Sequence, residues 1–128
     1  MFLIDPMSRC PVYEQIIGQV ERFVLSGVLK AGDQIPSVRS LSVTLSVNPN
    51  TIQKAYVDLD RRGILQTVPG KGCFVSPDAY RRLSEDKQRT GLAHFDELVH
   101  ELSLTGVAEA DLCARVHRIY EQGRTESV

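Results

Sequence analysis

Residues 47–56 read Val-Asn-Pro-Asn-Thr-Ile-Gln-Lys-Ala-Tyr and predict the start of a helix. Asn48 is a residue type favoured at the N-cap, and Pro49 suits the first helical position. One apolar face then follows at i, i+3, i+4 and i+7: Ile52, Ala55, Tyr56 and Leu59. The opposite face carries Asn50, Gln53, Lys54, Val57 and Asp58. Asn, Gln and Lys near a helix N-terminus are able to hydrogen-bond base edges and phosphates in a major groove.

A shorter helix is predicted just upstream. Ser37 is placed to cap it, and its apolar positions are Val38, Leu41 and Leu45. Residues 45–48 leave room only for a tight turn. A helix, a turn and a polar second helix form an arrangement typical of proteins that read DNA.

Downstream, two β-rich runs at residues 64–68 and 73–75 flank Pro69-Gly70-Lys71-Gly72. Such runs around a Pro/Gly turn predict a β-hairpin with a lysine at its tip. A helix-turn-helix followed by this hairpin is a winged helix. The predicted fold class is therefore mainly α with a small β-hairpin wing, followed by a short C-terminal helical segment.

The chain resembles the GntR family of bacterial transcription regulators, and within it the YtrA-like branch. The resemblance rests on five segments in the family's order and spacing, spanning roughly the first three-fifths of the chain: residues 11–16, 32–39, 47–51, 63–65 and 70–75. It implies a winged-helix DNA-binding domain with a short helical dimerisation tail. The sequence departs from the family's common pattern at Ser40, Asn48-Pro49 and Cys73. Where Asn48-Pro49 stand, the family often has Ser-Arg, and without that arginine an operator sequence cannot be transferred from other branches.

The resemblance implies that Arg39 contacts DNA, whereas a solvated charge is the alternative. Lys71 is expected to project toward DNA between two glycines that permit close approach, and an exposed turn lysine is the alternative. Arg61 and Arg62 are expected to interact favourably with the helix dipole, with phosphate contact as a secondary role. The candidate DNA-binding residues are Ser37, Arg39, Asn48, Asn50, Thr51, Gln53, Lys54, Gly70, Lys71 and Gly72.

Two apolar helical stripes follow the wing. The first consists of Leu92, Phe95, Leu98, Val99 and Leu102, and the second of Leu112, Val116, Ile119 and Tyr120. Gln122-Gly123 is expected to end the second helix. Two short helices cannot bury such stripes alone, so we expect a second copy of the chain to cover them. The predicted domains are residues 1–77, the DNA-binding domain, and residues 78–128, a dimerisation tail of two to three helices.

Before the winged-helix motif, residues 12–24 predict an amphipathic helix ending near Gly27. Its polar face is expected to be solvated: Glu14, Gln15, Gln19, Glu21 and Arg22. The segment Phe2-Leu3-Ile4 predicts either a short strand or a frayed terminus that packs a few apolar side chains.

The composition limits the classes of protein to which this chain can belong. The 128 residues contain no apolar run long enough for a transmembrane helix, and the N-terminus lacks the features of a secretory signal. Three scattered cysteines without metal-ligand spacing are typical of a reduced cytosolic protein, so a cytoplasmic location is expected. The net charge is −1, yet residues 37–72 carry five Lys/Arg against two Asp/Glu. This local excess predicts moderate non-specific DNA binding.

No enzyme active site, cofactor site or metal site is predicted. The three histidines, His94, His100 and His117, lie in the tail, where solvated or interface roles are favoured over metal binding. Gly70-Lys71-Gly72 lacks the spacing of a nucleotide-binding loop. Cys73 is interpreted as an inert strand residue, with an oxidant sensor as the alternative.

Together these features predict a homodimeric, sequence-specific regulator that binds a palindromic operator in double-stranded DNA and represses by occluding a promoter. The recognition helix would enter the major groove, with Lys71 toward the minor groove or the phosphates. Two alternatives stay open: a winged-helix module for protein–protein assembly, and a small-molecule or redox sensor using the dimer groove or Cys73. The effector stays unknown, and no membrane partner is expected.

Overall fold

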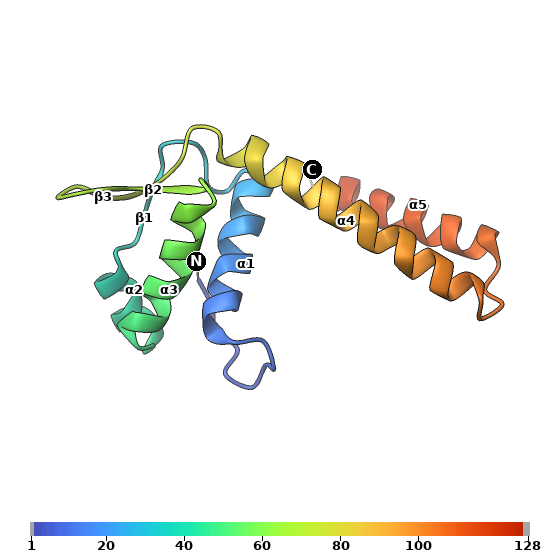
Figure 1. Cartoon of the computed structure of the whole chain (residues 1–128), viewed down its shortest axis with the longest axis horizontal. Coiled ribbons are helices and arrows are strands. Elements are labelled where there is room, and N and C mark those ends of the chain that lie inside the picture. Colours follow the sequence, from blue (N-terminus) through green and yellow to red (C-terminus); the bar gives the residue numbers. More distant parts are fainter. Residues whose placement is uncertain (1, 127–128) are drawn as a thin grey trace. The chain divides into compact units, whose positions relative to one another are not determined.

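The computed structural model describes residues 2–126, which form five helices and one three-stranded antiparallel sheet (Figure 1). In chain order the elements are α1 (Val12–Leu25), β1 (Gln34–Ile35), α2 (Val38–Leu45), α3 (Pro49–Arg61), β2 (Leu65–Val68), β3 (Gly72–Val75), α4 (Ala79–Ser103) and α5 (Glu109–Glu126). The strand order is β1-β3-β2, so the β2–β3 hairpin is the wing and β1 flanks it. The predicted winged helix-turn-helix fold is confirmed.

The helix-turn-helix begins at two side-chain caps. Ser37 Oγ accepts a hydrogen bond from Ser40 N (3.0 Å), and Asn48 Oδ1 accepts one from Asn50 N (2.8 Å). Both bonds satisfy backbone donors that have no partner within their own helix. Pro49 occupies the first residue of α3, where its missing N–H costs nothing. The two helix starts therefore lie where the sequence predicts them.

The turn between α2 and α3 uses a serine where glycine is the usual residue. Ser46 adopts a left-handed conformation with φ of 55°. Ser42 bonds the far side of this turn twice: its hydroxyl donates to Val47 O (2.6 Å), and its carbonyl accepts from Val47 N (3.1 Å). These two bonds hold a strained turn that fixes where α3 starts.

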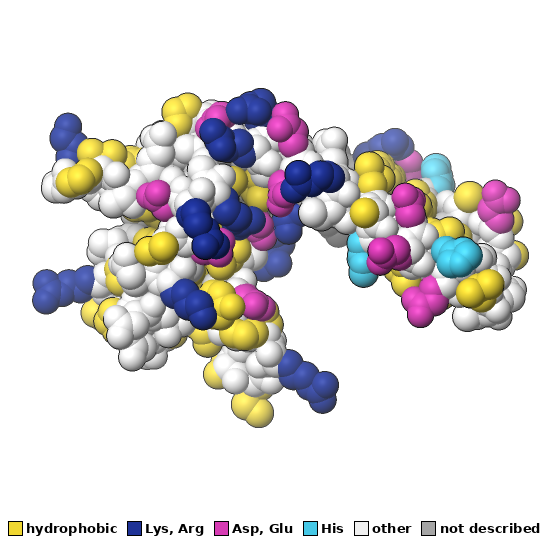
Figure 2. Space-filling model, viewed as in Figure 1, with side chains coloured by type: hydrophobic (Ala, Val, Ile, Leu, Met, Phe, Trp, Pro, Cys, Tyr) yellow, Lys and Arg dark blue, Asp and Glu magenta, His cyan; other side chains and the backbone are white. Residues whose placement is uncertain are grey.

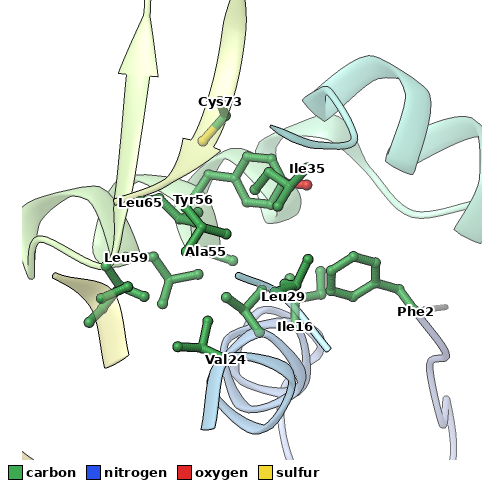
Figure 3. Packing of buried hydrophobic residues seen from close by; sticks show 14 of the residues in the cluster. Phe2, Ile16, Val24, Leu29, Ile35, Ala55, Tyr56, Leu59, Leu65 and Cys73 are labelled. Carbon is green, nitrogen blue, oxygen red and sulfur yellow. The ribbon is translucent and has the colours of Figure 1, made fainter. Parts of the chain in front are cut away.

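The buried face of α3 packs into the apolar core (Figure 3). The α3 residues Ile52, Ala55, Tyr56 and Leu59 are buried against α1, α2 and the sheet. The Tyr56 hydroxyl donates to Pro36 O at 2.7 Å, and burial raises the pKa of this phenol. The hydroxyl thus stays protonated and ties α3 to the residue that precedes the Ser37 cap.

The polar face of α1 is solvated only in part, because Glu14 and Arg22 are exposed whereas Gln15, Gln19 and Glu21 are partly or fully buried. Gln15 holds the N-terminal segment, because its amide accepts from Asp5 N (2.9 Å) and donates to Asp5 O (3.0 Å). Gln19 bonds the backbone N–H and C=O of Leu3 in the same way. Phe2 is buried, and its ring meets Phe23 edge-to-face at 5.6 Å between centroids. Residues 2–4 form no strand, and two glutamines and one aromatic pair anchor the segment instead.

The contacts divide the chain into two units, residues 1–86 and 87–128. Ala79 and Leu83 at the start of α4 are buried in the core of the first unit. In the second unit, α5 continues through Gly123 to Glu126. The expected helix end at Gln122-Gly123 is therefore wrong. One glycine costs a helix only about 1 kcal/mol, and one so near the end need not stop it.

Candidate nucleic-acid interface

The exposed face of α3 presents one stripe of side chains away from the core. Asn50, Gln53, Lys54 and Val57 are all exposed and follow one another at i, i+3, i+4 and i+7. This spacing lets one helix face touch consecutive base pairs in a major groove. Thr51 is half-buried at the edge of the stripe. Asn48 lies before it, and its side-chain oxygen is already engaged as the cap.

The start of α2 supplies a second exposed group. Ser37 caps the helix through its oxygen, which leaves its hydroxyl hydrogen available to a ligand. Arg39 lies in the first turn and is exposed. In the part of the chain that the structure describes, its guanidinium has no ion-pair or hydrogen-bond partner. A free guanidinium beside a helix N-terminus is well suited to a phosphate oxygen or a guanine edge.

The five basic residues of the segment 37–72 fall into two groups. Arg39 and Lys71 are exposed, and no acidic partner occurs for either among residues 2–126. The other three are engaged within the protein: Lys54 Nζ lies 3.8 Å from the centroid of the Tyr13 ring, Arg61 pairs with Asp58, and Arg62 pairs with Glu21 and Asp58. The expectation that Arg61 and Arg62 serve the helix dipole missed these partners. Lys54 stays exposed and can still reach a ligand after leaving Tyr13.

The wing tip is a tight four-residue turn, Val68 to Lys71. Lys71 N donates to Val68 O at 3.0 Å, Pro69 follows Val68, and Gly70 has φ of 78°. Proline second and a left-handed glycine third is the pattern of a type II turn. Lys71 is its last residue, and its side chain is exposed. The wing therefore presents one positive charge at the tip of the hairpin.

A groove of about 520 Å³ separates α3 from the wing. Ser37, Gln53, Val57, Thr67 and Gly72 are among the residues that line it. Three candidate DNA-binding residues thus border one depression, from the start of α2, from α3 and from the wing. Figure 2 shows Lys and Arg side chains projecting from the wing and from the end of the first unit that holds α2 and α3.

Cys73 forms part of the floor of this groove and is 7% exposed. Burial raises the pKa of its thiol, and the Thr67 hydroxyl lies 4.0 Å from Sγ. Reactive cysteines instead have a lowered pKa and an open approach for the oxidant. The geometry is that of a small apolar strand residue.

The described residues hold no group of three or more His, Cys, Asp or Glu side chains that could bind a metal ion. Within the same residues, every helix is too short or too polar to span a membrane.

Comparison with known proteins agrees with this geometry. The family model described as bacterial regulatory proteins, gntR family, matches residues 12–75. The HTH-type transcriptional repressor YtrA of Bacillus subtilis (strain 168) is 41% identical over 107 residues, which cover 84% of this chain and 82% of that protein.

Solved structures show the same fold. A GntR family transcriptional regulator from Listeria monocytogenes superposes with a TM-score of 0.72 at 31% identity, covering 90% of this chain and 98% of that one. The DNA-binding domain of AraR in complex with operator ORX1 superposes with a TM-score of 0.52 at 30% identity, covering 59% of this chain and 93% of that one. These relatives are regulators rather than enzymes, and the chain belongs to the gntR family of bacterial regulatory proteins.

Proposed function

We propose that this DNA-binding transcriptional regulator is a homodimeric repressor that occludes a promoter by binding a palindromic operator. The observation that carries the proposal is one groove lined by Ser37, Gln53 and Gly72, from the start of α2, from α3 and from the wing. Arg39 and Lys71, on α2 and at the wing tip, are exposed and have no acidic partner among residues 2–126. In this arrangement α3 reads base edges in the major groove. Arg39 and Lys71 contact phosphates or the minor groove on either side.

Repression by occlusion is supported by the likeness to YtrA, which is described as a transcriptional repressor. A bound winged-helix dimer occupies the double helix on which polymerase would otherwise assemble. The operator complex of the AraR DNA-binding domain supports direct operator contact by this fold.

The tail unit supports dimerisation. Leu92, Ile119 and Tyr120 remain 62%, 65% and 66% exposed, although all three belong to the predicted apolar stripes. Phe95, Leu98 and Val116 are also exposed, whereas Val99, Leu102 and Leu112 are partly covered. So much exposed apolar surface on a pair of helices is typical of a protein interface. A second copy offers the same surface, and a two-fold dimer matches a palindromic site.

The DNA-binding proposal is tested by fluorescence anisotropy with a labelled duplex from the region upstream of the protein's own gene. A scrambled duplex of equal length is the comparison, at two salt concentrations. We expect selective binding of two protomers per duplex, weaker at high salt. Lys71→Ala and Arg39→Ala should each weaken binding by roughly 1–3 kcal/mol, and Lys71→Ala should lower the salt slope by about one.

The matched control is Lys30→Ala, which removes the same charge from an exposed site between α1 and β1, outside the proposed interface. It should leave selective binding nearly unchanged. Equal, weak binding of both duplexes by the unaltered protein would refute the operator proposal and favour the protein-assembly alternative.

The dimer proposal is tested by sedimentation equilibrium. Ile119→Asp places a charge within the proposed interface and should yield a folded monomer. Leu104→Asp is the control, because Leu104 is 76% exposed in the same unit but lies outside both stripes. A dimer that survives Ile119→Asp as well as Leu104→Asp would exclude this surface.

A further inference from the structure

Both backbone polar groups of the wing lysine are bonded, and one of the bonds comes from a residue far away in the sequence. Lys71 N donates to Val68 O at 3.0 Å across the hairpin turn. Lys71 O accepts a hydrogen bond from Gln34 Nε2 at 3.1 Å, across a separation of 37 residues. Because N–H and C=O are both held, the direction in which the Lys71 side chain leaves the wing is fixed.

The backbone ladder of the sheet cannot supply the second bond. β1 pairs with β3 in the register Gln34↔Phe74 and Ile35↔Cys73. The next residue in this register is Pro36, which has no backbone N–H, and Ser37 after it caps α2. The Gln34 side chain reaches beyond the last strand pair and provides the donor that the backbone lacks.

Gly72 leaves the space that this side chain occupies. A Cβ on Gly72 would lie 2.6 Å from Gln34 Nε2, which is closer than real atoms approach. Gly72 also has φ of 127°, a conformation that side-chain-bearing residues rarely adopt. The second glycine of Gly70-Lys71-Gly72, which the sequence associates with close approach of DNA, therefore makes room for the Gln34 amide as well.

We propose that Gln34 is a positioning residue of the interface, whose amide orients Lys71 toward DNA. The inference rests on the proposed DNA contact of Lys71 and deepens it. Without the Gln34 bond, the wing tip must be ordered at the moment of binding. The affinity loss should match the net value of one neutral hydrogen bond, about threefold to tenfold.

Gln34→Met is the test variant, because it keeps the length of the side chain and removes the donor. Gln66→Met is the matched control. Gln66 is an exposed glutamine on β2 that pairs with the same Phe74 from the other side. Its side chain makes no hydrogen bond to any described residue, so its replacement should leave the tip unchanged.

Amide hydrogen exchange measured by NMR tests the bond without DNA. Exchange at Lys71 N–H should quicken severalfold in Gln34→Met and stay at the original rate in Gln66→Met. Equal exchange rates in Gln34→Met and in the unaltered protein would show that the amide does not hold the tip, and would overturn the proposal.

The DNA effect is tested by a double-mutant cycle in the anisotropy assay. Gln34→Met should weaken selective binding threefold to tenfold in the original background and less than twofold in the Lys71→Ala background. An undiminished loss in the Lys71→Ala background would mean that Gln34 acts independently of Lys71, which contradicts the proposal. Equal binding of the operator and scrambled duplexes by the unaltered protein would instead refute the proposed function. The exchange measurement would still test the Gln34 bond, because it uses no DNA.

Discussion

The ion pair between Glu21 and Arg62 should be a main support of the recognition helix. Arg62 follows the end of α3, and its Nη1 and Nη2 each lie 3.1 Å from Glu21 Oε2 on α1. Arg62 Nε also lies 3.1 Å from Asp58 Oδ1, as an ion pair whose angles fall short of a hydrogen bond. We expect replacement of Glu21 by Met, which is similar in length, to loosen α3 from α1.

The magnitude follows from burial. The side chain of Glu21 is 11% exposed and that of Arg62 is 31% exposed. Hydrogen bonds to charged groups contribute about 1.5–3 kcal/mol each. Here both N–H groups share one oxygen and Arg62 is partly solvated, so we expect Glu21→Met to lower the free energy of unfolding by about 2 kcal/mol in total. Arg61 and Asp58 offer a matched control, since they pair at the same 3.1 Å with the Arg61 side chain 75% exposed. Arg61→Met should cost less than about 0.5 kcal/mol.

The assay is urea unfolding without DNA, with Glu21→Met, Arg62→Met and the double variant forming a cycle. A coupling free energy of about 1–2 kcal/mol is expected between the two positions. A coupling below about 0.3 kcal/mol, within the error of additivity, would show that the pair adds nothing to packing. Equal losses of unfolding free energy in Glu21→Met and Arg61→Met would likewise contradict the argument from burial.

Three further predictions concern the turn at Ser46, the Cys73 thiol and the exposed face of α3. Ser46→Gly should stabilise the protein against urea by about 0.5–1 kcal/mol, because Ser46 holds a left-handed conformation that glycine adopts freely. Iodoacetamide at pH 8 should alkylate buried Cys73 more slowly than exposed Cys113, with similar rates in urea, since burial raises the Cys73 pKa and lowers its thiolate fraction. Exposed Val57 is expected to pack on a thymine methyl in the operator. Replacement of that thymidine by deoxyuridine, which lacks the methyl, should weaken operator binding about fourfold, and this loss should vanish in Val57→Ala.

The elements of the helix-turn-helix could be predicted because their signals are local. Ser37 and Asn48 cap residues two or three positions ahead, and the buried stripe of α3 repeats within the helix itself. Neither signal depends on the rest of the chain.

Apart from the helix end expected at Gln122-Gly123, the predictions that failed concern polar side chains with distant partners. Glu21 looks like one more solvated residue on α1, because its partner Arg62 lies 41 residues away. Gln15 and Gln19 meet a terminal segment whose path no periodicity describes. The left-handed conformation of Ser46 could not be predicted either, because it depends on two bonds from Ser42 and not on a glycine in the sequence.

These distant contacts share a consequence for how the interface can change. Glu21 fixes the end of α3 and Gln34 fixes the wing tip, and neither belongs to the predicted set of DNA-binding residues. Substitution at either position leaves the proposed DNA-contacting side chains intact and should alter the order of the element that carries them. Such changes should alter affinity for all sequences by a similar factor, whereas changes at Asn50 or Gln53 should alter the preference among sequences. Titrating Glu21→Met and Gln53→Ala against a set of single-base operator variants would separate these two effects. A shift in base preference with Glu21→Met would show that helix position, and not only side-chain chemistry, sets the specificity.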